Sequence, residues 1–170
     1  QSHLQIYLQI KNGSFSSLPG PFLILEDDVV ISSRIKTVLS RKYLYQSLPQ
    51  DWEMFFLDHL NLKCHEPWKK PLGLGAPRKS KKASSNVTSE FCLVDFTFQT
   101  SAYVLRNHTV VNKLVDKGNK RSVQIADVYF NQLFKNHTIK AYALLDRAVH
   151  QNQNKFKSDV QYADGSVKPK

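Results

Sequence analysis

Stretches of consecutive apolar residues alternate along the chain with segments in which apolar residues recur every three or four positions. The first stretch, Phe-Leu-Ile-Leu at residues 22–25, has no polar residue in alternation. This is typical of a strand buried on both faces, as in a parallel sheet. Residues 35–43 have helical spacing, and residues 54–57 form a second apolar stretch. The order predicts a β-α-β unit with two parallel strands.

The remaining pattern predicts further elements of the same two kinds. A helix is expected over residues 1–10, where an Asn-Gly pair ends it, and a Pro-Gly-Pro break separates it from the first strand. A sequence rich in Pro, Gly, Lys and Ser predicts a long loop from residue 61 to about residue 90. Strands are expected at residues 91–94, 98–105 and 139–144, and helices at residues 110–118 and 125–133. We therefore expect one α/β domain with a mostly parallel central sheet flanked by helices.

Three adjacent carboxylates, Glu26, Asp27 and Asp28, directly follow the first predicted strand. Ligands of open α/β sheets bind at the carboxyl ends of strands, and carboxylates this close cannot all ionise without a compensating cation. Glu26 and Asp28 are two positions apart, so they would project to the same side and share a hard ion such as Mn²⁺ or Mg²⁺. The alternative is an acidic turn that caps the next helix.

The composition narrows the classes of protein that fit this pattern. The chain has 170 residues, of which 41% are hydrophobic, and its 24 basic and 14 acidic residues give a net charge of +10. That surplus would suit a nucleic acid, but the basic residues are not interleaved with aromatic residues, and no second His/Asp cluster completes a two-metal nuclease site. No apolar run approaches the roughly 20 residues that span a bilayer. We expect no specific nucleic-acid partner and no transmembrane segment, and a metal-dependent phosphoesterase or nuclease is the less favoured alternative.

The carboxylates belong to an ordered set of short motifs. Ser-His at residues 2–3 precedes Phe-Leu-Ile-Leu-Glu-Asp-Asp-Val at residues 22–29, Leu-Pro-Gln-Asp-Trp-Glu at residues 48–53, Thr-Ser-Ala-Tyr-Val at residues 100–104, and then Asp127, Gln151 and Ser-Asp-Val at residues 158–160. In this order the chain resembles the family 25 glycosyltransferases, which include bacterial lipopolysaccharide galactosyltransferases and animal procollagen hydroxylysine galactosyltransferases. Family members usually have a nucleotide-binding strand before the Ser-His pair, and they more often have Gly near the Asp58-His59 position.

The resemblance implies a Rossmann-like GT-A fold over residues 1–160, incomplete at its N-terminus, with a polar basic tail at residues 161–170. It also implies inverting, metal-dependent transfer of a hexose, most often galactose, from a UDP-sugar to a hydroxyl group of a glycan or of hydroxylysine in a collagen-like protein. Asp127 would be the general base that accepts the proton of that hydroxyl. The metal ligands would be Glu26 and Asp28, with Asp27 in their place if the register is shifted, and His150. The donor-binding residues would be Ser2, His3, Asp58, Gln151, Ser158 and Asp159.

Each of these roles has a structural alternative. Asp127 would serve equally as a helix N-cap, and so would Ser2. A solvated histidine is the favoured interpretation of His150. For the whole chain, the alternative to an enzyme is a catalytically inactive binding module that retains the fold.

Four Asn-x-Ser/Thr sequons, at Asn12, Asn86, Asn107 and Asn136, favour passage through the lumen of the endoplasmic reticulum or Golgi if the protein is eukaryotic; otherwise a cytoplasmic protein is expected. Cys64 and Cys92 flank the predicted loop and would form a disulfide in such a lumen, or remain two free thiols. The sequence does not indicate an oligomeric state.

Overall fold

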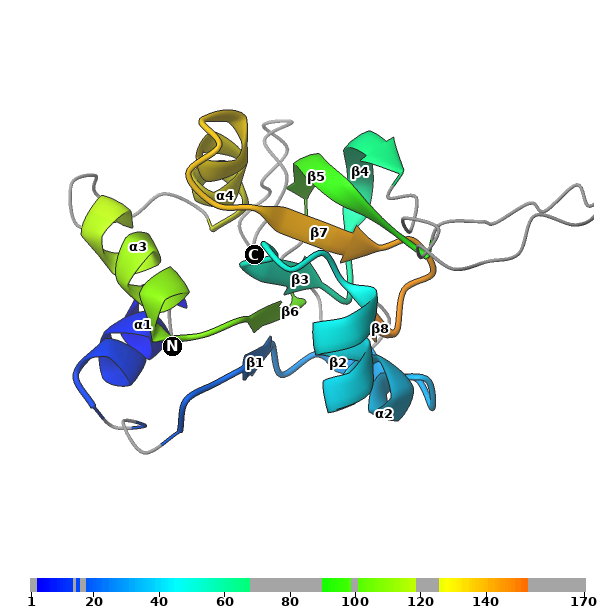
Figure 1. Ribbon diagram of the computed structural model, residues 1–170, viewed down its shortest axis with the longest axis horizontal. Helices are drawn as coiled ribbons and strands as arrows, with labels where there is room; N and C mark the ends of the chain where they lie inside the picture. Colours follow the sequence, from blue (N-terminus) through cyan, green and yellow to red (C-terminus); the bar gives the residue numbers. More distant parts are fainter. Residues whose placement is uncertain are drawn as a thin grey trace, which may run out of the picture.

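The computed structural model describes residues 3–13, 15, 18–67, 90–98, 101–118 and 126–152. Within them a six-stranded sheet has helices on both faces (Figure 1), which confirms the expected mixed α/β class. The helices are α1 (His3–Lys11), α2 (Ile35–Val38), α3 (His108–Gly118) and α4 (Ala126–Lys135), and a π-helical turn, η1, spans Tyr43–Ser47. The strands are β1 (Phe22–Leu25), β2 (Val29–Ile31), β3 (Met54–Phe56), β4 (Leu60–Pro67), β5 (Phe91–Phe98), β6 (Ala102–Leu105), β7 (Ala141–Leu144) and β8 (Val149–Gln151).

The strands of the large sheet lie in the order β1-β6-β3-β7-β5-β4. Among these described strands β3 and β7 pair in parallel, whereas the other four neighbouring pairs are antiparallel. The expectation of a mostly parallel sheet is therefore wrong. β1 and β3 do run in the same direction, as in a β-α-β unit, but β6 lies between them and pairs with both.

The apolar stretches indicate strands that are buried on both faces, and this is why they predicted a parallel sheet. The burial itself is present in the structure. Every residue of β3, β6 and β7 is buried. One face of the sheet packs against α1, α3 and α4, and the other packs against α2, η1 and the residues around Trp52 and Val149. Two-sided burial requires helices on both faces but does not require strands of one direction.

β1 differs from the strand that the sequence predicts. It lies at one end of the described sheet, and Leu23 is 40% exposed while Phe22 and Ile24 are buried. The expected central strand is therefore an edge strand with one covered face. α1 lies beside α3 (Figure 1), and Tyr7 and Ile10 of α1 are its buried residues.

The second, smaller sheet was not predicted. β2 and β8 pair antiparallel, so that Val29 lies opposite Gln151 and Val30 lies opposite His150. This pairing joins the segment after the three carboxylates to the segment at the end of the described chain.

A strand also occupies part of the predicted loop, because β4 covers residues 60–67 and pairs with β5. A disulfide between Cys64 and Cys92 joins these two strands, so the disulfide alternative is confirmed. The expected helix at residues 35–43 consists of two short pieces, α2 and η1. The proposed domain boundary at residue 160 and the tail at residues 161–170 lie outside the described residues.

Candidate functional site

β1, β3 and β7 run in the same direction, so their carboxyl ends meet at one edge of the sheet, where the antiparallel β6 begins. There the N–H of Glu26, directly after β1, donates to the carbonyl oxygen of Ser101, directly before β6 (2.8 Å). Asp58 follows β3 and Arg147 follows β7. We call Glu26, Asp58, Ser101 and Arg147, together with His3, the carboxyl-edge cluster.

A chain of hydrogen bonds ends on the Glu26 carboxylate. His3 Nε2 lies 3.3 Å from Glu26 Oε1, and His3 Nδ1 lies 2.7 Å from the Tyr103 hydroxyl, which contacts the Tyr7 hydroxyl. In the His3 tautomer that donates from Nε2 to Glu26, Nδ1 accepts from the Tyr103 hydroxyl, whose oxygen can accept from the Tyr7 hydroxyl. Burial raises the pKa of both tyrosines well above the usual range, so both remain protonated donors. The chain fixes the direction of one Glu26 oxygen.

Asp58 is fully buried, although the resemblance assigned it to the donor. Its Oδ2 accepts from the Ser101 hydroxyl (2.6 Å), and its Oδ1 accepts from the His59 N–H (2.9 Å) and from Arg147 Nη1 (3.4 Å). With no exposed surface, this carboxylate does not face solvent, and it could influence a ligand only through its neighbours. The Arg147 side chain is 38% exposed, so Asp58 holds a guanidinium group that reaches solvent at the sheet edge. Burial also lowers the pKa of His59, whose Nε2 contacts the carbonyl oxygen of Leu144 (2.9 Å).

Asp28, which the resemblance assigned to the metal, lies with Gln151, which it assigned to donor binding. Gln151 Nε2 donates to Asp28 Oδ2 (2.6 Å), and the N–H of Asn152 donates to the Asp28 carbonyl oxygen (2.7 Å). The other carboxylate oxygen, Oδ1, is buried and has no hydrogen-bond partner among the described residues. A buried carboxylate oxygen in this state is costly unless a donor or a cation meets it.

The metal prediction can be compared with this geometry. In the part of the chain that the structure describes, no three His, Cys, Asp or Glu side chains are grouped to hold an ion. Hard ions such as Mg²⁺ are nevertheless often held by one or two carboxylates, with phosphates and water completing the shell. Glu26 Oε2 and Asp28 Oδ1 make no hydrogen bond within the described residues, so each carboxylate keeps an acceptor oxygen that could meet such an ion.

Three other predicted residues lie apart from these contacts. Asp27 and His150 are both exposed. Side chains alternate along β8, and because Gln151 points toward Asp28, its neighbour His150 points away. Asp127 is the second residue of α4, so it lies inside the first turn and not at the N-cap position that the structural alternative named; a carboxylate there complements the helix dipole. One turn later the Phe130 ring packs on Tyr103, with 5.5 Å between ring centroids, so α4 is anchored beside the hydrogen-bond chain.

Several expectations concern residues outside the described ranges, namely Ser2, Asn86, Ser158 and Asp159. Of the other sequons, Asn12 and Asn136 are exposed, and Asn107 is half-buried and caps α3, since its Oδ1 accepts from the N–H of Val110 (3.3 Å).

Sequence reasoning missed Ser101, Arg147 and the roles of Tyr7 and Tyr103. Tyr103 is fully buried in the core, and its hydroxyl group also belongs to the chain that ends on Glu26. The available signal for Arg147 was its place just after an apolar strand, the same signal that singled out the three carboxylates.

No protein-family model matches this sequence, and no curated protein matches it significantly. In the described part of the chain, none of the helices has the length and apolar character that crossing a bilayer requires.

Proposed function

We propose that this protein is a glycosyltransferase that moves a hexose, most often galactose, from a UDP-sugar to an acceptor hydroxyl group. The acceptor would be a glycan or hydroxylysine in a collagen-like protein, and the transfer would be inverting and metal-dependent on a GT-A-like fold. The observation that carries the proposal is the contact between His3 and Glu26. Two residues that the family resemblance assigns to one site, and that are 23 positions apart, touch at a sheet edge.

Two further contacts support the same location. Asp28 contacts Gln151, which is 123 positions away in the sequence. Asp58 contacts both Arg147 and Ser101. The carbonyl oxygen of Ser101 accepts a hydrogen bond from the N–H of Glu26. The carboxyl ends of strands are where ligands of α/β sheets bind, so this edge is a suitable place for a nucleotide donor.

In this proposal each residue of the site would have a separate role. His3 orients one Glu26 oxygen and Gln151 orients one Asp28 oxygen, which leaves Glu26 Oε2 and Asp28 Oδ1 for Mn²⁺ or Mg²⁺. Such an ion supplies charge that neutralises the departing diphosphate. Arg147, held by Asp58, presents a cation to the same anionic group. Asp127 would accept the proton of the acceptor hydroxyl group.

Thermal unfolding tests the donor site directly. In saturating Mn²⁺, UDP at about 100 times its dissociation constant should stabilise the protein by about 2.7 kcal/mol relative to Mn²⁺ alone, which corresponds to roughly 5–10 °C for a chain of this size. Glu26→Gln and Asp28→Asn should each abolish most of this shift. Asp27→Asn is the matched control, because it removes the same charge from the exposed neighbour and should leave the shift intact.

The outcomes separate the alternatives. A rise in the melting temperature with duplex DNA and none with UDP would favour the nuclease. No rise with either ligand would refute the proposed donor site. Loss of the shift in Asp27→Asn alone would mean that the register of the carboxylates is different from the proposed one.

A transfer assay then tests catalysis. The protein is incubated with UDP-galactose or UDP-glucose, Mn²⁺ and a hydroxylysine-containing collagen peptide, and sugar transfer is measured by mass spectrometry. Asp127→Asn should keep the UDP-dependent stabilisation and lose transfer by at least about a hundredfold, the usual contribution of a general base. Stabilisation by UDP without transfer to peptide or glycan acceptors would favour the inactive binding module.

A further inference from the structure

A pocket of about 700 Å³ lies at the opposite edge of the sheet from the carboxyl-edge cluster, where β1 and β3 begin and β6 ends. Three segments that are far apart in the sequence line it: residues 19–21 before β1, residues 39–45 around the start of η1, and Arg106 with Asn107 between β6 and α3. The volume is in the range of small-molecule sites, about 300–1,000 Å³.

The charge of this pocket is entirely positive among its described lining residues. Arg41 and Arg106 line it, no Asp or Glu does, and neither arginine forms an ion pair within the described part of the chain. Two guanidinium groups in one concavity raise the local potential and attract an anion.

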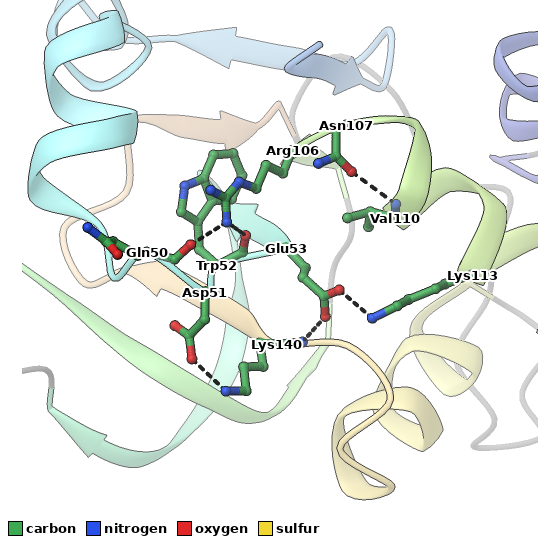
Figure 2. A network of polar contacts seen from close by, with 9 residues as sticks. All are labelled: Gln50, Asp51, Trp52, Glu53, Arg106, Asn107, Val110, Lys113 and Lys140. Atoms are coloured by element: carbon green, nitrogen blue, oxygen red, sulfur yellow. Dashed lines mark hydrogen bonds and ion pairs between the residues drawn. The ribbon is translucent and has the colours of Figure 1, made fainter. Parts of the chain in front are cut away.

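Arg106 is fixed in place by neutral groups (Figure 2). Its Nη1 donates to the carbonyl oxygens of Gln50 and Trp52 (3.2 Å for Trp52), and its guanidinium carbon lies 5.7 Å from the centroid of the Trp52 ring. The two nearby carboxylates bind other cations: Asp51 contacts Lys140, and Glu53 contacts Lys113. The charge of Arg106 is therefore held rigidly and is not cancelled.

The part of the lining next to Arg106 is equally constrained. Gly20 has a φ of +94°, and a Cβ on it would lie 2.7 Å from the Arg106 carbonyl oxygen, so the backbone approach at this position requires glycine. Tyr45, also in the lining, is 43% exposed, and its ring is braced against the Trp52 indole with 6.3 Å between centroids. An aromatic face is thus available beside the two arginines.

From this arrangement we infer that the pocket binds a phosphate monoester that carries a flat ring, at a site separate from the donor site. A phosphate dianion has enough acceptor oxygens to meet both guanidinium groups, and arginine is the side chain best suited to it. The ring lies against Tyr45 and the apolar side chains of Leu39 and Leu44.

Isothermal titration calorimetry at about 0.15 M salt tests the inference with three probes: phenyl phosphate, inorganic phosphate and phenol. Phenyl phosphate should bind more tightly than inorganic phosphate by at least about threefold, and phenol should not bind measurably. Arg41→Gln should weaken the binding of both phosphate probes by about three- to fivefold, which is the usual contribution of an exposed charge contact. Tyr45→Leu should weaken phenyl phosphate alone. The protein is produced without glycosylation so that Asn107, which lines the pocket, carries no sugar.

Two controls locate the binding. Lys42→Gln removes an equally exposed charge from the residue next to Arg41 that does not line the pocket, and it should bind phenyl phosphate like the unmodified protein. Glu26→Gln with Asp28→Asn alters the donor site and should also leave this binding unchanged. Unchanged affinity in Arg41→Gln, or an equal loss in Lys42→Gln, would overturn the inference.

Discussion

Removal of Asp58 and removal of Arg147 should lower the stability of the protein by different amounts. Asp58 is fully buried and Arg147 is 38% exposed, with 3.4 Å between Oδ1 and Nη1. At an effective dielectric constant of about 20, unit charges at this separation attract by about 5 kcal/mol, and the cost of burying Asp58 offsets part of this. We therefore expect a coupling free energy of about 2 kcal/mol.

The two single substitutions should differ, because they leave different groups behind. Arg147→Gln leaves a buried carboxylate with only neutral donors, and it should lower the free energy of unfolding by about 3 kcal/mol. Asp58→Asn leaves a guanidinium group that solvent can reach, and it should cost only about 1 kcal/mol, since an amide still pairs with Ser101. The double variant should cost about 2 kcal/mol, which is less than the sum of the two.

Urea unfolding at pH 7 with linear extrapolation measures all four proteins. Arg34 and Asp146 supply a matched control, an Arg–Asp pair whose side chains are 31% and 87% exposed. The same cycle on that pair should give a coupling of about 0.5 kcal/mol or less. The reasoning fails if the Asp58 and Arg147 substitutions are additive, or if Asp58→Asn is the more damaging of the two.

Three other predictions follow from the fold. Gly20→Ala should lower stability by about 2 kcal/mol or more, as measured by urea unfolding, because its Cβ would meet the Arg106 carbonyl oxygen at a positive φ. Reduction of the Cys64–Cys92 disulfide, which spans 28 positions, should cost about 3.5 kcal/mol by chain entropy; a Cys64→Ser, Cys92→Ser variant should not respond to dithiothreitol. Burial lowers the pKa of His59 below its ordinary value of 6.5, so the unfolded chain takes up the proton first and stability should fall as the pH drops below about 6.5. A pH series of urea midpoints checks this, and a slope that persists in His59→Gln would assign it to another group.

The elements of the fold were largely predictable, but their arrangement was not. The stretches at residues 22–25 and 54–57 do form strands, because runs of apolar residues report burial. They do not report strand direction, and nothing local indicates that residues 102–105 pair between them. β2 and β8 escaped prediction because each is short and forms only by pairing with the other, which lies far away along the chain.

The candidate site shows the same division. The three carboxylates were identifiable from their place after a strand, but the contacts His3–Glu26 and Asp28–Gln151 were not predicted, because they join distant segments. The burial of Asp58 was not predictable, because a carboxylate after a strand is usually exposed unless a distant partner joins it. That partner, Arg147, is 89 positions away, a separation at which sequence pattern carries no information.

The position of β6 between β1 and β3 has a consequence for how the chain folds. β1 and β3 do not pair with each other in the native sheet, and their native neighbours, β6 and β7, are synthesised after both of them. Contacts of such long sequence separation form slowly, and apolar strands that have not yet paired tend to aggregate with other chains. The nascent protein should therefore depend on chaperones until about residue 105 has emerged, after which β6 joins the two halves of the sheet.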